Sequence, residues 1–567
     1  MRLGMTERVR AQWHFLPGVF LSAFFIIRAG YASGGSFLPT LFDDAMISMT
    51  YAKTYSTYGE LVWYPGAERV QGYSNPGWTM FFVLLHKLEH LNVSAILLVQ
   101  ICGVLILIGI AKNTQSLIEI INPKASLFHI RLYSGSVMFL YPLMFWTLRG
   151  MEVGVLSLLL TSIIRAIWKL ESKKRNMSYL LLCTFASLGV FIRLDFIIFI
   201  LAILVSGVIR DKKILLQNLF LFTSSSLSLT AILYVQYKYY GSAMPNTFYL
   251  KLENIEIQDR LIRGSLNLLK HLNLLLLPLI FIYFTIRKVL IDKRLLDLLM
   301  CLLFGFTYSI WVGGDAWEWS GMTNRYISTT LPLLCAILGS LPIQRFTHNI
   351  GIRQYIKLVA FLAFTGSLIG VYTNPIRFEF SRALVYLLIF LVVMFPLITL
   401  FSKLMSPQSQ GSLLSLSILL MCVNLSGMYY FIRDGGIHVK DDQKIAITSL
   451  FLSQQMNSRS STALFWAGTP GYYLPGKLYD LLGKNDYDTA KLIPDGEFWP
   501  GHDKHDFAGV ICKRLPDYVF SVSGDLGIPS TLINLGYEIT ATPHFVVWKR
   551  INTNLPAETT KIVCSNT

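Results

Sequence analysis

Long apolar runs recur along most of this 567-residue chain and stop near residue 431. Residues 15–27, 93–110, 384–400 and 413–431 are examples. Runs of this kind are long or dense enough to cross roughly 30 Å of hydrocarbon as helices. Hydrophobic residues make up 53% of the chain, whereas charged residues make up 14%. This is more apolar surface than a soluble domain buries. We therefore expect a polytopic α-helical membrane protein with about 11–13 spanning helices.

The first apolar run resembles a signal peptide, because Arg2, Arg8 and Arg10 precede it. Residues 29–33 make a poor cleavage site, however, and Arg28 interrupts the end of the run. We expect a retained signal anchor.

The net charge of +16 indicates membrane topology. Lys and Arg cluster in short loops between apolar runs, at residues 173–175, 210–213 and 287–294. Such loops face the cytoplasm by the positive-inside rule, so the charge does not indicate a nucleic-acid partner. We expect an inner (plasma) membrane protein of bacterial type.

This topology puts residues 33–75 on the non-cytoplasmic face, followed there by four short segments between helices. One stretch conflicts with the crossing count, because residues 111–131 carry basic side chains on the face expected to be outside. A short or re-entrant helix near residues 76–90 or 132–148 would remove the conflict. The four segments are residues 149–152, 193–195, 238–252 and 313–325.

Composition changes after residue 432, where Gly, Pro, Asp and Tyr become frequent. Short apolar stretches at residues 463–466, 518–522 and 544–548 predict strands. We divide the chain into a membrane domain, residues 1–431, and a soluble α/β domain, residues 432–567, on the non-cytoplasmic face.

The soluble domain contains Cys512 and Cys564. These two cysteines are able to form a disulfide if the domain faces an oxidising compartment.

Two carboxylates, Asp43 and Asp44, open a predicted helix directly after the first span. Apolar residues at 42, 45, 46 and 49 indicate a helix lying along the membrane surface. One interpretation is that either Asp caps this helix. The other is that one carboxylate is a general base for an acceptor hydroxyl, with a pKa tuned by its neighbours.

Aromatic, turn-forming and hydrogen-bonding residues are dense between residues 63 and 78. Tyr73, Asn75 and Trp78 are typical of carbohydrate sites, where aromatic faces cover sugar C–H surfaces and amides bind hydroxyls. An aromatic belt at the membrane interface has the same composition.

Further blocks with possible functional residues follow in order along most of the chain. They are Asp43-Asp44-Ala45, Gly72-Tyr73-Ser74-Asn75-Pro76 with Trp78, Phe145-Trp146-Thr147-Leu148 with Gly150-Met151-Glu152, Tyr239-Tyr240-Gly241-Ser242-Ala243-Met244-Pro245-Asn246-Thr247, Val312-Gly313-Gly314-Asp315 with Arg325 and Pro332, and Gly468, Tyr472, Asp480-Leu481-Leu482-Gly483, Gly501-His502 and Pro516-Asp517.

In this order the blocks resemble the polyprenyl-phosphate-dependent GT-C glycosyltransferases, and most closely the terminal β-arabinofuranosyltransferase branch of mycobacterial cell walls. The resemblance implies transfer of a single sugar from a polyprenyl-phosphate donor, with inversion, on the non-cytoplasmic face. Two departures from the pattern concern substrate choice. Arg149 stands where a small polar residue is expected, and residues 193–196 replace an expected Arg-Pro-Asp-Gly.

A phosphate leaving group needs positive charge where its own charge develops. Arg69, Arg193, Lys251 and Arg325 are the cations that we expect on that face, and we favour Arg325 and Arg193. Arg193 and Lys251 have an alternative role, snorkelling from helix ends to the interface.

Three other residues are candidate substrate contacts. Glu152 begins an apolar run, where an unpaired carboxylate is costly, so it either binds substrate or pairs with Arg149. Asp315 follows two glycines and is suited to orient an Arg or to accept from a sugar hydroxyl, or the segment is a plain turn. The resemblance adds Asn246 as a substrate contact.

His502 lies near His505 in an acidic loop. We weighed a structural metal, a solvated loop, and contact with the acceptor or donor phosphate, and we assign His502 to the phosphate. The spacing predicts no metal ligands, although the chemistry is compatible with a divalent cation.

The sequence therefore predicts a membrane glycosyltransferase whose donor is a polyprenyl-phosphate sugar, with arabinofuranose as the sugar suggested by the resemblance. Its partners would be a glycan or glycolipid acceptor of the cell envelope and membrane lipid. A transporter or flippase for lipid-linked sugars and a protein O-glycosyltransferase are the alternatives.

Overall fold

The structure is a computed structural model. It describes residues 12–33, 36–89, 93–172, 176–210, 212–268, 292–318, 324–340, 431, 433–436, 438–496, 498–520, 528–551 and 563–564.

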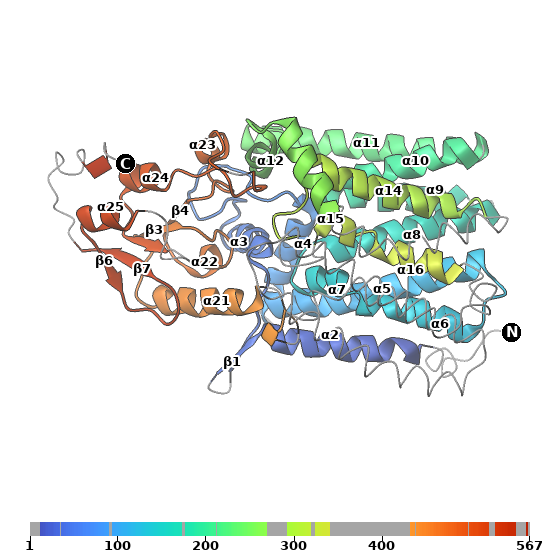
Figure 1. The fold of residues 1–567 in the computed structure, drawn as a ribbon, viewed down its shortest axis with the longest axis horizontal. Coiled ribbons are helices and arrows are strands. Elements are labelled where there is room, and N and C mark those ends of the chain that lie inside the picture. Colours follow the sequence, from blue (N-terminus) through green and yellow to red (C-terminus); the bar gives the residue numbers. More distant parts are fainter. Residues whose placement is uncertain are drawn as a thin grey trace.

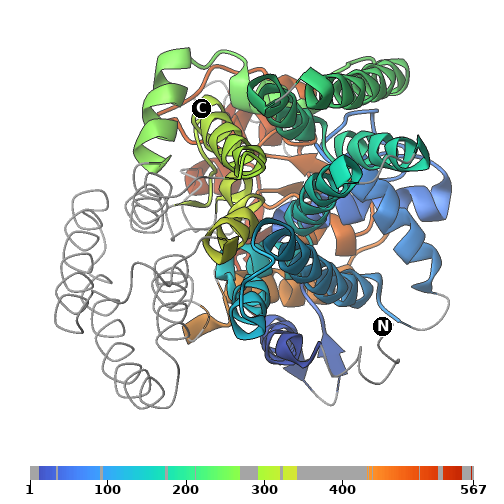
Figure 2. The same cartoon turned by 90° about the vertical axis from the view of Figure 1, so that its right-hand side faces the viewer.

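Long helices form a bundle that makes up one part of the molecule, and a sheet-containing part lies at one end of that bundle (Figure 1). Viewed from the opposite end, the helices surround a filled interior (Figure 2). Helix α5 packs against α8, and α10 packs against α11 and α14. These longer helices are α2 (Leu16–Ala29), α5 (Ala95–Ile121), α8 (Val153–Ser172), α9 (Asn176–Ile192), α10 (Ile197–Arg210), α11 (Lys212–Tyr240), α14 (Leu295–Trp311) and α16 (Leu331–Ser340).

Within the described residues, three helical stretches are long and apolar enough to cross a membrane: Ala95–Ile121, Val153–Leu170 and Ile214–Tyr240. Three shorter apolar helices accompany them, at Trp13–Ala29, Tyr179–Ile192 and Leu295–Trp311. The predicted span at 384–400 and all but the last residue of the one at 413–431 lie outside the described residues, so the count of about 11–13 spans stays a prediction.

The outward faces of the bundle are apolar. Phe20 of α2, Leu180 of α9 and Leu227 of α11 are 71%, 71% and 68% exposed. Large exposed apolar surfaces of this extent are unfavourable in water and favourable against lipid tails. The observed surface agrees with the predicted membrane protein.

Short helices occur near residues 76–90 and 132–148, where the sequence predicted one to reconcile the number of membrane crossings with the basic residues of 111–131. Helix α4 (Pro76–Lys87) has 12 residues, which span about 18 Å and cannot cross the hydrocarbon. Helices α6 (Leu127–Ser136), η3 (Val137–Phe139) and α7 (Tyr141–Leu148) follow one another as a broken passage. The expected short helix is therefore present.

Helix α3 (Asp43–Tyr58) lies between the bundle and the sheet-containing part (Figure 1). Ala45, Met46 and Met49 are buried in the core of the bundle. Ile47 and Tyr51 are buried in a second core, shared with the sheet. The prediction that this helix lies along the membrane surface is therefore wrong in one respect. Protein covers both faces of α3, because the sheet-containing part closes over its outer side.

The C-terminal part contains a five-stranded sheet of order β4-β3-β5-β7-β6. Strand β3 pairs in parallel with β4 and β5, whereas β7 is antiparallel to β5 and β6. The predicted strands near 463–466, 518–522 and 544–548 correspond to β3, β5 and β7. The strands are β3 (Ser461–Leu464), β4 (Lys477–Asp480), β5 (Tyr518–Phe520), β6 (Tyr537–Thr540) and β7 (Val547–Arg550).

Alternating strand residues fill cores on the two faces of the sheet. Ala463 and Val519 face a core with helices α24 and α25. Leu464 and Phe520 face the core shared with α3 and with α21. The helices are α21 (Val439–Ser453), α22 (Thr469–Tyr473), α23 (Tyr487–Ala490), α24 (Phe507–Arg514) and α25 (Pro529–Asn534).

Cys512 of α24 and Cys564 form a disulfide, as the sequence suggested. Smaller elements complete the described structure: η1 (Trp13–Phe15), β1 (Tyr31–Ser33), β2 (Ser36–Leu38), η4 (Leu194–Phe196), α12 (Asn246–Leu252) and α15 (Arg325–Ser328).

Candidate active site

Asp44, on the first turn of α3, is held between two cations. Its Oδ1 accepts a hydrogen bond from Lys484 Nζ at 2.8 Å, and its Oδ2 accepts from Arg325 Nη1 at 3.1 Å. The indole Nε1 of Trp317 lies 3.4 Å from the same Oδ2. Although burial opposes ionisation, the nearby Lys484 and Arg325 charges hold the pKa of Asp44 well below its usual range. Asp44 is therefore a carboxylate at neutral pH.

Asp43, the preceding residue, is buried, and its carboxylate accepts hydrogen bonds from backbone N–H groups. Its Oδ1 accepts from the backbone N–H of Thr469 at 2.7 Å, and its Oδ2 accepts from that of Gly468 at 3.2 Å. Burial raises the pKa of Asp43, and the charge of Lys484 and these backbone hydrogen bonds partly oppose that rise. Asp43 thus joins α3 to the start of α22.

Neither carboxylate caps its own helix. The N-cap residue of α3 is Phe42, and no side chain accepts a hydrogen bond there. The capping interpretation is therefore wrong, and the two acids have different surroundings because adjacent helical residues point about 100° apart.

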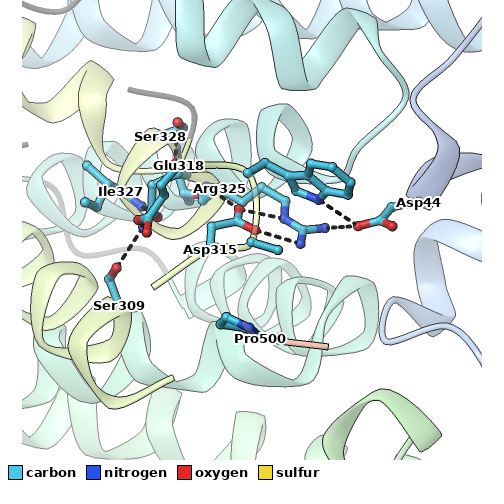
Figure 3. Close-up of polar contacts among 12 residues, drawn as sticks. Asp44, Ser309, Asp315, Glu318, Arg325, Ile327, Ser328 and Pro500 are labelled. Carbon is cyan, nitrogen blue, oxygen red and sulfur yellow. Dashed lines mark hydrogen bonds and ion pairs between the residues drawn. The ribbon is translucent and has the colours of Figure 1, made fainter. Parts of the chain in front are cut away.

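Asp315 orients Arg325, one of the two roles that the sequence allowed. Its carboxylate accepts from Arg325 Nε at 2.9 Å and from Nη2 at 3.0 Å, and the backbone N–H of Arg325 donates to it at 3.0 Å. Figure 3 shows the guanidinium between Asp315 and Asp44. The guanidinium also lies over the ring of Trp146, 5.5 Å from its centroid. Such a planar, bidentate clamp fixes the direction of the remaining N–H groups.

A cavity opens beside Asp44, where α3, the segment after Gly72, α12 and the 500–502 loop meet. It encloses about 540 Å³, counting space open to solvent. Five of the residues predicted as substrate or phosphate contacts line it, together with residues that the sequence did not single out. The lining is Asp44, Ile47, Ser48, Gly72, Tyr73, Ser74, Asn75, Met151, Thr247, Leu250, Lys251, Ala316, Arg325, Lys484, Pro500, Gly501 and His502.

His502 lies at the cavity as a neutral side chain. Its ring stacks on Trp499 and meets the edge of Trp317. Burial lowers the pKa of His502 to about 3. Since Nδ1 lies 3.1 Å from the carbonyl oxygen of Pro500, Nδ1 carries the proton and Nε2 is an acceptor. The predicted phosphate contact is therefore an uncharged hydrogen-bonding group.

Lys484 was not predicted from the sequence. It belongs to a loop at the end of β4 that Asp480 holds, accepting from the backbone N–H of Leu482 at 2.9 Å and of Asn485 at 2.7 Å. Asn246 Nδ2 donates to the carbonyl oxygen of Gly483 at 2.8 Å. Asn246, expected to bind substrate, instead fixes the loop that carries Lys484.

A polar chain connects this cavity to a second one. Asn75 Nδ2 donates to Glu152 Oε2 at 2.8 Å, and Ser48 Oγ donates to Asn75 Oδ1 at 2.8 Å. The other oxygen of Glu152 accepts from Arg193 Nη1. Arg193 Nε also donates to Asp195 Oδ2 at 2.9 Å. The alternative pairing of Glu152 with Arg149 is wrong.

Arg149 has a different, distant partner. It forms a buried ion pair with Asp442 of α21, and its Nη1 donates to the carbonyl oxygen of Thr40 at 3.0 Å. Arg149 therefore holds the segment that leads into α3 against α21. This pairing explains how the chain accommodates an arginine where the resemblance predicts a small polar residue.

The second cavity lies between the ends of α8, α10, α14 and α15, on the other side of Arg325. Its walls combine charged and aromatic residues with apolar ones. They are Val153, Leu156, Arg193, Asp195, Ile198, Phe199, Tyr308, Arg325, Tyr326 and Thr329.

Five predicted contacts line neither cavity: Glu152, Asn246 and Asp315, described above, and Arg69 and Trp78. Arg69 is exposed and lies over the ring of Tyr239, 4.7 Å from its centroid. Trp78 is buried, and its Nε1 donates to the carbonyl oxygen of Gly150 at 2.9 Å. Tyr73, by contrast, lines the first cavity while its hydroxyl lies 2.9 Å from that of Tyr240.

Across the described ranges, no group of three or more His, Cys, Asp or Glu side chains is arranged to hold a metal ion. His505, the other histidine of the predicted metal alternative, stacks on Phe507.

Solved structures with the GT-C membrane fold resemble this chain, whereas no protein-family model and no curated protein sequence matches it. One is ArnT from Cupriavidus metallidurans bound to undecaprenyl phosphate, with a TM-score of 0.57 over 97% of this chain and 99% of ArnT, at 11% identity. The apo state of that ArnT has a TM-score of 0.56 over 94% and 97%, at 12% identity. The apo oligosaccharyltransferase of Archaeoglobus fulgidus reaches 0.49 over 96% and 75%, at 9% identity. The likeness to ArnT shows a shared fold.

Proposed function

We propose that this protein is a membrane glycosyltransferase that moves one sugar from a polyprenyl-phosphate donor to a hydroxyl of a cell-envelope glycan or glycolipid, with inversion. The observation that carries the proposal is the cavity in which one carboxylate, Asp44, lies among Arg325, Lys484 and Lys251. Such a site combines a base with cations for a leaving phosphate. The fold of ArnT, whose solved structure contains undecaprenyl phosphate, supports the lipid donor.

In the proposed reaction Asp44 accepts the proton of the acceptor hydroxyl. The hydroxyl oxygen forms a bond to the anomeric carbon while the bond from that carbon to the phosphate oxygen breaks. The electron pair of the broken bond stays on the phosphate, and Arg325 and Lys251 stabilise its charge. Attack opposite the leaving group gives inversion, and no covalent enzyme intermediate is required.

The second cavity suits the lipid end of the donor. Arg193 and Arg325 lie beside the apolar side chains of Ile198 and Phe199 there. A polyprenyl chain would lie against the apolar wall with its phosphate directed to Arg325, the residue that lines both cavities. The sugar would then project into the first cavity, towards Asp44.

Tyr73, Asn75 and His502 are positioned to contact the sugar or the acceptor. An aromatic face covers sugar C–H surface, and His502 Nε2 accepts a hydrogen bond from a hydroxyl. The C-terminal part would bind the acceptor. The proposed site lies on the non-cytoplasmic face of a bacterial inner membrane.

A donor panel tests this function. Purified protein in nanodiscs is incubated with synthetic polyprenyl-phosphate sugars, arabinofuranose first, and with a membrane-glycan acceptor fraction. We expect one donor to release polyprenyl phosphate in step with sugar transfer. Donors that bind without turnover under every acceptor condition would contradict the proposal.

The same panel separates the alternatives. A flippase would move the labelled lipid-linked sugar across a proteoliposome membrane without releasing the phosphate, and it would tolerate Asp44→Asn. A protein O-glycosyltransferase would transfer the sugar to a Ser- or Thr-rich protein in place of a glycan.

A further inference from the structure

Both oxygens of the Asp44 carboxylate are occupied by cations. Lys484 holds Oδ1 at 2.8 Å, and Arg325 holds Oδ2 at 3.1 Å. Two such partners stabilise the ionised form and make the carboxylate a weak base. Each oxygen keeps a second lone pair, so an acceptor hydroxyl can still donate to it, but the carboxylate takes the proton poorly while both cations stay paired. Asp44 therefore becomes an effective base when one cation leaves it.

The two cations are held very differently. Arg325 is fixed by two side-chain hydrogen bonds and one backbone hydrogen bond to Asp315. Lys484 Nζ donates to Asp44 alone among the residues that the structure describes. Of the two, Lys484 is the cation that is able to leave.

The backbone around Lys484 is anchored, so such a movement would be confined to the side chain. Asp480 accepts from two backbone N–H groups of the loop, and Asn246 Nδ2 donates to the carbonyl oxygens of Gly483 and Asp486 at 2.8 and 2.9 Å. A lysine has four flexible carbons and three donor protons, which allow its ammonium to exchange between acceptors within the cavity.

The other groups that face Asp44 do not supply this exchange. Trp317 donates from an uncharged indole at 3.4 Å, and His502 is neutral. Asp43 is held by the backbone of α22. Lys251 lines the cavity but has no hydrogen bond to Asp44.

We propose that Lys484 is a charge switch operated by the donor. When the phosphate of a polyprenyl-phosphate sugar enters, the ammonium moves from Asp44 Oδ1 to a phosphate oxygen. Oδ1 is then free to accept the proton of the acceptor hydroxyl, and the same ammonium stabilises the phosphate as it leaves. The inference rests on the proposed function and ties the basicity of Asp44 to the presence of donor.

The test measures binding of undecaprenyl phosphate to the full-length protein in nanodiscs made of zwitterionic lipid. Lys484→Met removes the charge at similar length, and Lys484→Arg keeps it. Both are measured in the wild-type background and in Asp44→Asn. Lys251→Met is the matched control, because Lys251 lines the same cavity without pairing to Asp44. Undecaprenol and inorganic phosphate separate the lipid chain from the anion.

We expect Lys484→Met to weaken undecaprenyl phosphate binding by about 10-fold in the wild-type background and by about 100-fold in the Asp44→Asn background. The loss is larger with Asp44→Asn because Lys484 then binds the phosphate without first breaking its ion pair with Asp44. Lys251→Met should give the same loss in both backgrounds. Lys484→Arg should retain binding, and undecaprenol should not respond to Lys484→Met. Elution volume and helical circular dichroism check that the variants fold.

Two outcomes overturn the switch. Unchanged affinity in Lys484→Met would mean that Lys484 stays on Asp44, and equal losses in the two backgrounds would mean that no exchange occurs. A wild-type protein that binds no undecaprenyl phosphate would instead contradict the proposed function.

Discussion

Glu318 is a buried carboxylic acid next to the Arg325 clamp, in the segment between α14 and α15. Asn324 Nδ2 donates to its Oε1, and Figure 3 shows the side chain beside Ser309. Burial and, secondarily, the charge of Asp315 raise the pKa of Glu318 to about 8. The folded protein therefore keeps Glu318 protonated at neutral pH, whereas the unfolded chain ionises it.

This difference predicts how stability depends on pH. Because the pKa of Glu318 is higher in the folded protein than in the unfolded chain, its carboxyl group contributes stability. That contribution is fully present below pH 4.5, the unfolded pKa, and is lost as pH rises through about 8, the folded pKa. We expect the melting temperature in detergent to fall between pH 7 and 9, and Glu318→Gln to reduce that fall. The window above pH 7 avoids Asp480, whose pKa burial raises to about 6. Parallel pH profiles for the two proteins would contradict the assignment.

Asp43 gives a second prediction at the residue scale. Removing its carboxylate leaves the buried N–H groups of Gly468 and Thr469 without their acceptor. Asp43→Ala should lower the free energy of unfolding by about 1–3 kcal/mol. Limited proteolysis should then cleave the C-terminal part faster. Asp488→Ala is the control, since that side chain is 82% exposed, and equal effects of the two would refute the role.

Between elements, the strongest constraint is the buried pair of Arg149, before α8, with Asp442 of α21. Arg149→Met leaves an uncompensated carboxylate, and breaking a buried pair in this way costs about 3–5 kcal/mol. We expect a large drop in melting temperature. The double variant Arg149→Met/Asp442→Asn should recover much of that loss, and a double variant as unstable as the single one would argue against the pairing.

Helices and strands with local signals could be predicted from the sequence. The apolar runs at 15–27 and 93–110 predicted α2 and α5, and strand-like stretches predicted β3, β5 and β7, because each depends on neighbours in sequence. The buried position of α3 could not be predicted. Its outer face is covered by Ile445 and Leu464, which lie about 400 residues later.

The residues of the candidate site likewise divide into those that the sequence predicted and those that it did not. Asp44, Arg325 and Lys251 were predicted because charged residues beside membrane spans are conspicuous. Lys484 was missed, since Gly483-Lys484-Asn485 has the composition of an ordinary surface turn and its partner is 440 residues away. Asn246 was assigned to substrate for lack of any sequence signal that it anchors that turn.

For the whole molecule, we predict that the C-terminal part and the turn between α5 and α6 lie on opposite faces of the membrane. Ser458 and Lys124 are exposed at these two places. In intact cells we expect an impermeant maleimide to label Ser458→Cys and to reach Lys124→Cys only after permeabilisation. Labelling of both from outside would refute this topology, and the parent protein provides the background from its own cysteines.

The central claim is that Asp44, with its cations, performs the chemistry while Asp43 has a structural role. The most direct measurement is the single-turnover rate of sugar transfer from the accepted polyprenyl-phosphate donor by wild type, Asp44→Asn and Asp43→Asn, each checked for folding. We predict that Asp44→Asn loses about 10²-fold or more in rate at unchanged stability. Asp43→Asn should instead reduce the stability of the protein more than its rate of sugar transfer. Transfer at the wild-type rate by folded Asp44→Asn would contradict the account.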